Sequence, residues 1–175
     1  EHGRYAFSNQ PVIAQWNLAR LAETLVPLAG ADPDEAVQRM TAVLETFAAR
    51  FEHHRMAAMR EKLGLMTSNA GDAALVNRLL DLMQRETVDY TVAYLTLTET
   101  EGAAQGRFES LFEDKAAIGS WLTDWQARLS AEGSNAAAAK TIMQAANPAY
   151  IPRNHRIEEA IRAAEDEGDF APFQR

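Results

Sequence analysis

The chain has 175 residues, of which 47% are hydrophobic and 24% are charged, and its formal net charge is -8. These proportions are typical of a globular protein with a substantial core, and the absence of cysteine excludes disulfides, thiol nucleophiles and cysteine-bound metal centres within these residues. The negative charge disfavours nucleic acid as a partner, and the lack of an apolar run of about 18 residues argues against a membrane partner.

The first helix is predicted at residues 11–28, where apolar side chains recur near one stripe, and Gly30 is expected to end it. Asn9 is expected to cap its first turn. Pro11 suits a helix start, because the first turn has no use for the N–H group that proline lacks.

A second helix start is indicated by DPDE at residues 32–35, with Asp32 as the N-cap and Pro33 at the first helical position. Helical spacing then continues to Gly64, which predicts a helix of about 30 residues. We allow for a kink near residues 53–54. The basic residues of this stretch alternate with Glu52 and Glu61, so they are interpreted as an ordinary charged helix face.

The middle of the chain begins with a turn-rich stretch at residues 67–72, in which Asp72 can cap the next helix. Residues 88–98, VDYTVAYLTLT, fit either a strand or a helix by spacing. We predict a helix, because no second strand is available to satisfy the backbone groups of a lone strand.

The last part of the chain is predicted to hold a loop at residues 99–107 and a helix at residues 108–129 that Gly119 could split. An alanine-rich helix should follow residues 133–135 and end near Pro148. A final helix after Pro152 should stop at Gly168. The predicted fold class is therefore all-α, with several helices and no sheet.

Motifs for catalysis and metal binding are absent. The sequence contains no glycine-rich phosphate loop and no G-x-S-x-G element. His53 and His54 are adjacent, so their side chains diverge on a helix, and His155 with Glu159 forms one i, i+4 pair, which is more typical of an ion pair than of a metal site. No catalytic, cofactor-binding or metal-binding residue is therefore predicted within this chain.

Two polar clusters remain, at residues 4–17 and 147–155, and each mixes aromatic, proline, arginine and asparagine side chains. By themselves they are interpreted as loops held by helix caps and side-chain-to-backbone hydrogen bonds.

Long strings of the sequence resemble the selenoprotein O family of protein adenylyltransferases, which have a kinase-like fold. They are GRYAFSNQPVIAQWNLARLAETLVPL at 3–28, LGLMT at 63–67, LLDLMQRETVDYT at 79–91, NPAYIPRNHRIEEAI at 147–161 and GDFAPF at 168–173. Their order and their spread over the chain make the resemblance specific.

The length fits one domain, and the resemblance implies that residues 1–175 are a single helical domain, a fragment that forms the C-terminal part of a kinase-like large lobe with a helical extension. Residues 1–10 would end an activation-like segment, residues 11–28 would be the central large-lobe helix, and residues 32–175 would form the extension. The parent enzyme would use ATP and Mg²⁺ to transfer AMP to Ser, Thr or Tyr of protein substrates. Its catalytic groups would lie in a preceding kinase-like part, so we expect this chain alone to hold neither ATP nor Mg²⁺ and to be inactive.

A supporting shell for the active site is the hypothesis for the two polar clusters. Its residues would be Arg4, Asn9, Gln10, Trp16, Asn17, Arg153, Asn154 and His155. The alternative function is a freestanding helical protein-interaction module without enzymatic activity. The expected location is the cytoplasm, or the mitochondrion if the source is eukaryotic.

Overall fold

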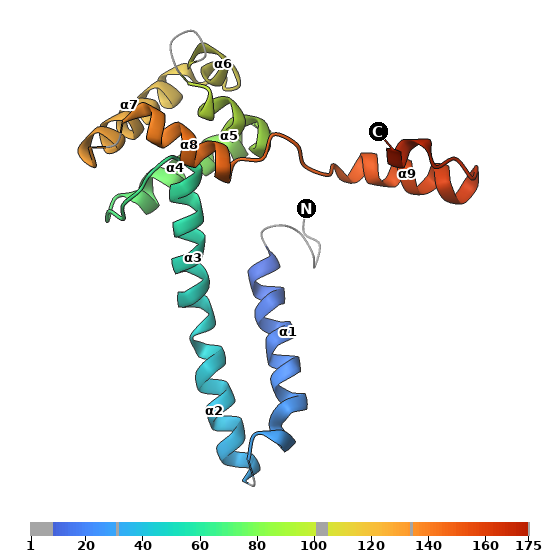
Figure 1. The fold of residues 1–175 in the computed structure, drawn as a ribbon. Coiled ribbons are helices and arrows are strands. Elements are labelled where there is room, and N and C mark those ends of the chain that lie inside the picture. Colours follow the sequence, from blue (N-terminus) through green and yellow to red (C-terminus); the bar gives the residue numbers. More distant parts are fainter. Residues whose placement is uncertain (1–8, 31, 101–104, 134, 175) are drawn as a thin grey trace. The chain divides into compact units, whose positions relative to one another are not determined.

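The computed structural model describes residues 9–30, 32–100, 105–133 and 135–174, and in these residues all regular structure is helical (Figure 1). The all-α prediction without a sheet is confirmed for this described part. No helix in it is long and apolar enough to cross a membrane.

Two compact units make up the chain, residues 1–59 and residues 60–175. The division falls within α3 (Phe47–Lys62). The segments that the family resemblance suggested, and the roles given to them, stay predictions.

The first unit is built on a helical hairpin, in which α1 (Gln10–Leu25) packs against α2 (Pro33–Glu45) (Figure 1). A short 3₁₀ helix, η2 (Val26–Leu28), extends α1, so residues 11–28 are helical as predicted but the last turn is tighter. No residue of α1 is buried in this chain.

The predicted cap of α1 by the Asn9 side chain is wrong. Asn9 occupies the N-cap position, but its side chain makes no capping hydrogen bond. Its backbone is helical, at φ -93° and ψ -8°, whereas a capping side chain works best from an extended backbone. Pro11 lies in the first turn as predicted.

The cap of α2 is confirmed, because the Asp32 carboxylate accepts hydrogen bonds from the amides of Asp34 (2.9 Å) and Glu35 (3.4 Å).

The predicted kink near residues 53–54 is not seen, since α3 is continuous there. The break falls at Thr46, between α2 and α3. There both the backbone N–H and the hydroxyl of Thr46 donate to the Val43 carbonyl, which tightens the turn.

The second unit contains α4 (Asp72–Arg85), α5 (Tyr90–Thr98), α6 (Gln105–Ser110), α7 (Lys115–Ala131) and α8 (Ala136–Ala146). Helix α4 packs on α7, α5 on α6 and α8, and α6 on α7 (Figure 1). The indole N–H groups of Trp121 and Trp125 donate to the carbonyls of Leu75 (2.8 Å) and Leu63 (2.9 Å), so both rings are buried without an unsatisfied donor. The largest fully buried side chains here are those of Asp72 and of the hydrophobic residues Leu63, Val76, Leu79, Tyr94, Leu97, Phe108, Phe112, Ile118, Trp121 and Leu122.

The ambiguous stretch at residues 88–98 contains a helix, as predicted. The Asp89 side chain caps α5 by accepting a hydrogen bond from the Val92 amide at 2.9 Å. Helix α5 then buries Ala93, Tyr94 and Leu97 on one side, which a strand with alternating faces could not do.

Two boundaries after α5 differ from the prediction. Residues 105–107 belong to α6 rather than to a loop, and the segment at 108–129 is broken at residues 111–114 instead of at Gly119. The Asp114 side chain accepts from the Ala117 amide at 2.9 Å and so starts a new helix. Gly119 lies inside α7, where the cost of one glycine, about 1 kcal/mol, is small beside the burial of neighbouring Ile118 and Trp121.

The C-terminal helices agree with the prediction. The Asn135 side chain caps α8 through the Ala138 amide (2.8 Å), and α9 (Asn154–Asp166) is followed by Gly168 with φ +67° and a 3₁₀ turn, η4 (Ala171–Gln174). Gly64, at φ +73°, follows α3, and a Cβ atom there would lie only 3.0 Å from Ala139 of α8. That close approach requires glycine.

Candidate functional site

Among the predicted supporting residues of the first unit, Asn9 and Gln10 lie at the start of α1, and Trp16 and Asn17 lie further along the same helix. Arg4 is outside the described residues. Gln10 and Asn17 are exposed, and Trp16 is 46% exposed, with the Arg20 guanidinium 5.6 Å from its ring centroid. Of the described members of this set, none is buried in this chain, and their role near an active site stays a prediction.

The predicted supporting residues of the second unit begin with an ion pair. Arg153 donates two hydrogen bonds to the Asp89 carboxylate, at 2.6 and 3.2 Å. These hydrogen bonds, with that of the Val92 amide, lower the pKa of Asp89. Asn154 and His155 are exposed in the first turn of α9, and Glu159 pairs with Arg156 (2.9 Å). Arg153 therefore joins the start of α9 to the cap of α5.

A cluster of four charges around the buried Asp72, which the sequence analysis did not find, lies in the second unit. We call Arg60, Asp72, Arg128 and Glu132 the Asp72 cluster. The Asp72 side chain is 1% exposed and lies between the two arginines, with each Nε atom 2.8 Å from one of its oxygens. Arg128 also contacts Glu132 at 3.0 Å. The prediction that Asp72 caps α4 is wrong, because Gly71 is the N-cap and Asp72 is the first helical residue, with its carboxylate bound to the two arginines. Arg60 therefore does not belong to an ordinary solvated helix face.

The Asp72 cluster fixes the loop between α3 and α4. Glu132 accepts hydrogen bonds from the amides of Met66 and Thr67, both at 3.1 Å, and from the Thr67 hydroxyl at 2.8 Å. Arg128 donates to the Thr67 carbonyl (2.7 Å), and Asp72 accepts from the Asn69 amide (2.8 Å). Side chains of α7 and α4 therefore satisfy the backbone groups of an otherwise irregular loop.

The two carboxylates of the cluster are held in their charged form. Burial alone would raise the pKa of Asp72, but the hydrogen bonds from Arg128, the Asn69 amide and Arg60 outweigh burial and lower this pKa. The same balance lowers the pKa of Glu132, where the amide of Met66 and both donors of Thr67 contribute with Arg128.

Acid should therefore destabilise the second unit. Carboxylates with a lowered folded-state pKa contribute stability above their unfolded-state pKa, about 4, and this stability is lost as the pH falls through the folded-state values. We expect the free energy of unfolding to decline below about pH 5. Urea unfolding from pH 7 to pH 3 measures this decline, which should be shallower in Asp72→Asn. An equally steep decline in that variant would assign the effect to other carboxylates.

A second polar contact joins the end of α3 to the end of α8. Lys62 Nζ donates to the Ala146 carbonyl (3.0 Å) and to Asn147 Oδ1 (3.3 Å), and burial lowers the pKa of Lys62. The buried Asn147 amide donates in turn to the Lys62 carbonyl and to the Thr98 hydroxyl. The positive charge of Lys62 lies at the C-terminus of α8, where it is stabilised by the negative end of the helix dipole.

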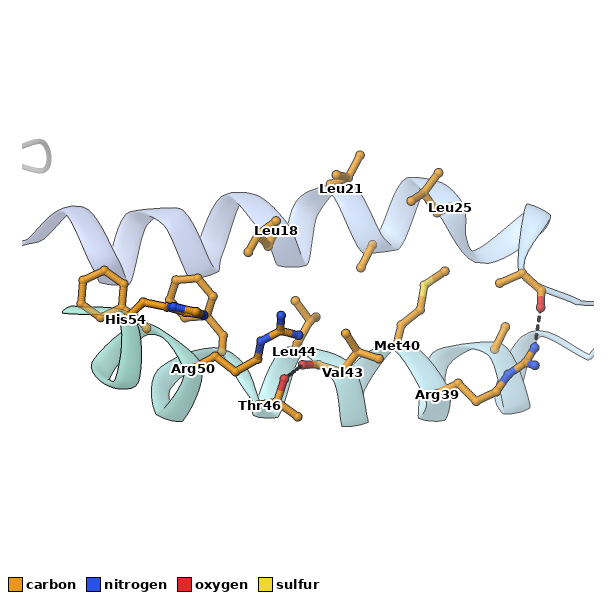
Figure 2. A pocket seen from close by; sticks show the side chains of 15 residues that line it. Leu18, Leu21, Leu25, Arg39, Met40, Val43, Leu44, Thr46, Arg50 and His54 are labelled. Carbon is orange, nitrogen blue, oxygen red and sulfur yellow. Dashed lines mark hydrogen bonds between the residues drawn. The ribbon is translucent and has the colours of Figure 1, made fainter. Parts of the chain in front are cut away.

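A hydrophobic groove runs along the hairpin of the first unit, and we call it the hairpin groove. Its volume is about 800 Å³. Leu18 of α1 and Met40 and Leu44 of α2 point toward one another across it, while Arg50 and His54 of α3 lie along one side (Figure 2). Several of its apolar side chains are exposed in this chain, including Leu18, Leu21, Leu25, Val43 and Phe51.

These features indicate structural roles. In the Asp72 cluster two cations face two anions, and each group contacts its neighbours, so the cluster presents no evident base or nucleophile. Among the described residues, no three or more His, Cys, Asp or Glu side chains come together as metal ligands would. The expectation that this chain holds no metal ion stays a prediction.

One spacing in the sequence indicates part of the Asp72 cluster. Arg128 and Glu132 are spaced i, i+4, as ion pairs on one helix face are. Nothing in the spacing of Arg60, Asp72 and Arg128 predicts that they meet, because their contact depends on how three helices pack.

Comparison with known proteins decides the family. The family described as Protein adenylyltransferase SelO matches residues 1–175, the whole chain. The chain belongs to the SelO family. The resemblance stated from the sequence is thereby confirmed.

Named relatives in the SelO family are bacterial. A protein of Rhizobium johnstonii called Protein nucleotidyltransferase YdiU is 48% identical over 176 residues, and those of Rhizobium etli and Rhodopseudomonas palustris with the same name are each 47% identical. The alignments cover 98–99% of this chain but 35% of each relative. The chain therefore spans about a third of the length of these relatives.

Proposed function

We propose that this chain is the C-terminal helical region of a SelO-type protein adenylyltransferase and that it supplies structure rather than catalytic groups. The match to the family over all 175 residues carries this proposal. The named relatives are nucleotidyltransferases, and the chain corresponds to about a third of their length. The complete protein would transfer AMP from ATP to Ser, Thr or Tyr hydroxyls of protein substrates.

The described residues do not fit an ATP and Mg²⁺ site. Triphosphate binding needs cations that are available to phosphate oxygens, and Mg²⁺ needs carboxylates that are free to coordinate it. Arg60 and Arg128 are bound to Asp72, the hairpin groove that contains Arg39 and Arg50 has no carboxylate to hold Mg²⁺, and no cluster of three potential metal ligands lies in the described part of the chain. We therefore assign ATP and Mg²⁺ to a kinase-like part outside these residues.

Nucleotide transfer by a chimera tests the scaffold role. The matching 176 residues of the Rhizobium johnstonii relative, at 48% identity, would be replaced by this chain. We expect the chimera to transfer AMP from labelled ATP to protein, because core packing should be preserved at this identity, while the 175-residue chain alone should transfer none.

Two outcomes would contradict the proposal. One is a chimera that melts like its parent but transfers no nucleotide, and the other is transfer by the isolated chain. The alternative, a freestanding interaction module, is favoured by the exposed hairpin groove. It predicts that this chain binds a partner without contributing to a working chimera.

A further inference from the structure

The charges around the hairpin groove are segregated. Its titratable lining residues are Arg39, Arg50 and His54, all basic. Within residues 9–30 and 32–59, no carboxylate lines the groove, although this part of the chain has six acidic residues against four arginines. Its acidic side chains are Glu23, Asp32, Asp34, Glu35, Glu45 and Glu52.

The dimensions of the groove fit a helix better than a compact small molecule. Its lining extends along α2 and α3 from Ala36 to His54, a span of roughly 27 Å at 1.5 Å per residue. An amphipathic helix of about 18 residues has this length and can place apolar side chains at i, i+4 and i+7 into such a groove.

A second copy of the groove is a poor occupant. Face-to-face pairing of two hairpins would place Arg39 and Arg50 of both copies in one partly desolvated seam. Like charges in a seam of that kind oppose association. Carboxylates on the partner would be attracted to the same two side chains.

We infer that the hairpin groove binds an amphipathic helix with an apolar stripe and acidic edges, supplied by the part of the complete protein that lies outside this chain. This inference rests on the proposed function, in which that part contains the catalytic groups. The named relatives are about three times as long as this chain, which leaves ample polypeptide for such a helix. Arg39 and Arg50 would select it by charge, His54 could donate a hydrogen bond to it, and the leucines would bind its apolar stripe.

A peptide titration tests the chemistry of the groove. The probe is a fluorescein-labelled helical peptide of about 18 residues with Leu at i, i+4, i+7 and i+11 and Glu along both edges, and the matched control has Lys in place of each Glu. We expect the 175-residue chain to bind the Glu peptide about tenfold more tightly by fluorescence anisotropy, because two or three partly shielded ion pairs contribute that much. Added salt should reduce the difference.

Variants of the chain show whether binding occurs in the groove. Arg50→Glu should reduce or reverse the preference for the Glu peptide, and Leu21→Asp should weaken binding of both peptides. Both residues are exposed, so neither change should unfold the chain, which circular dichroism checks. Equal affinity for the two peptides, no binding of either, or binding that Leu21→Asp leaves unchanged would overturn the inference.

The chimera shows where the helix comes from. Arg50→Glu in the chimera should lower its melting temperature, because the groove would be filled by a helix of the same protein. Unchanged melting would mean that the occupant is not part of that protein and would overturn the inference. If the unsubstituted chimera transfers no nucleotide, the proposed function fails instead, and the peptide titration, which needs no nucleotide, still decides the chemistry of the groove.

Discussion

Asp72→Asn should lower the free energy of unfolding of the second unit by about 3–5 kcal/mol, the cost of removing one member of a buried ion pair. The substitution keeps the shape of the side chain but leaves Arg60 and Arg128 without the anion that lies 2.8 Å from each. Asp72 itself is 1% exposed, but Glu132 remains beside Arg128, so we expect a loss at the lower end of this range. Urea unfolding followed by the fluorescence of Trp121 and Trp125, in a Trp16→Phe background, reports on this unit.

A matched control is Asp124→Asn on α7. Asp124 pairs with Arg78, but both side chains are about half exposed, so its loss should cost at most about 1 kcal/mol. Adding Arg60→Gln to Asp72→Asn should cost less than the sum of the two single changes, because the residues share one network. Additive effects, or equal losses for the two aspartates, would show that the Asp72 cluster does not act as a unit.

Trp121→Ala should destabilise the second unit by about 3–5 kcal/mol, as expected for truncation of a buried tryptophan. The ring is 0% exposed, it lies 6.1 Å from the Phe108 ring and 6.0 Å from the Trp125 ring, and its N–H donates to the Leu75 carbonyl. Its removal leaves a cavity where α4, α6 and α7 meet. The midpoint of urea unfolding, measured by circular dichroism, should fall accordingly.

The control for this truncation is the same substitution at an exposed tryptophan. Trp16→Ala removes a ring that is 46% exposed, and we expect a loss within about 1 kcal/mol. A larger loss at residue 16 than at residue 121 would mean that the packing of α1 matters more in this chain than its exposure indicates.

Much of the helical structure could be predicted from the sequence, because helix starts are encoded locally. Asp32 and Asn135 each cap a helix whose start the sequence analysis had placed, and Gly168 follows the last helix. The errors have local causes as well. Thr46 and Asp114 make short-range hydrogen bonds that move a break by several residues, and periodicity does not detect such bonds.

The sequence by itself determined the fold class and, through strings that match over the whole chain, the family. Only the tertiary structure decided which polar residues are buried together. Arg60 and Asp72 are 12 positions apart, and Arg128 is 56 positions beyond Asp72, yet the three meet at one carboxylate. Likewise, only the packing of α1 beside α2 brings exposed leucines and three basic side chains to one groove. The reason is that caps and periodicity act within a few residues, whereas burial depends on which helix faces meet in space.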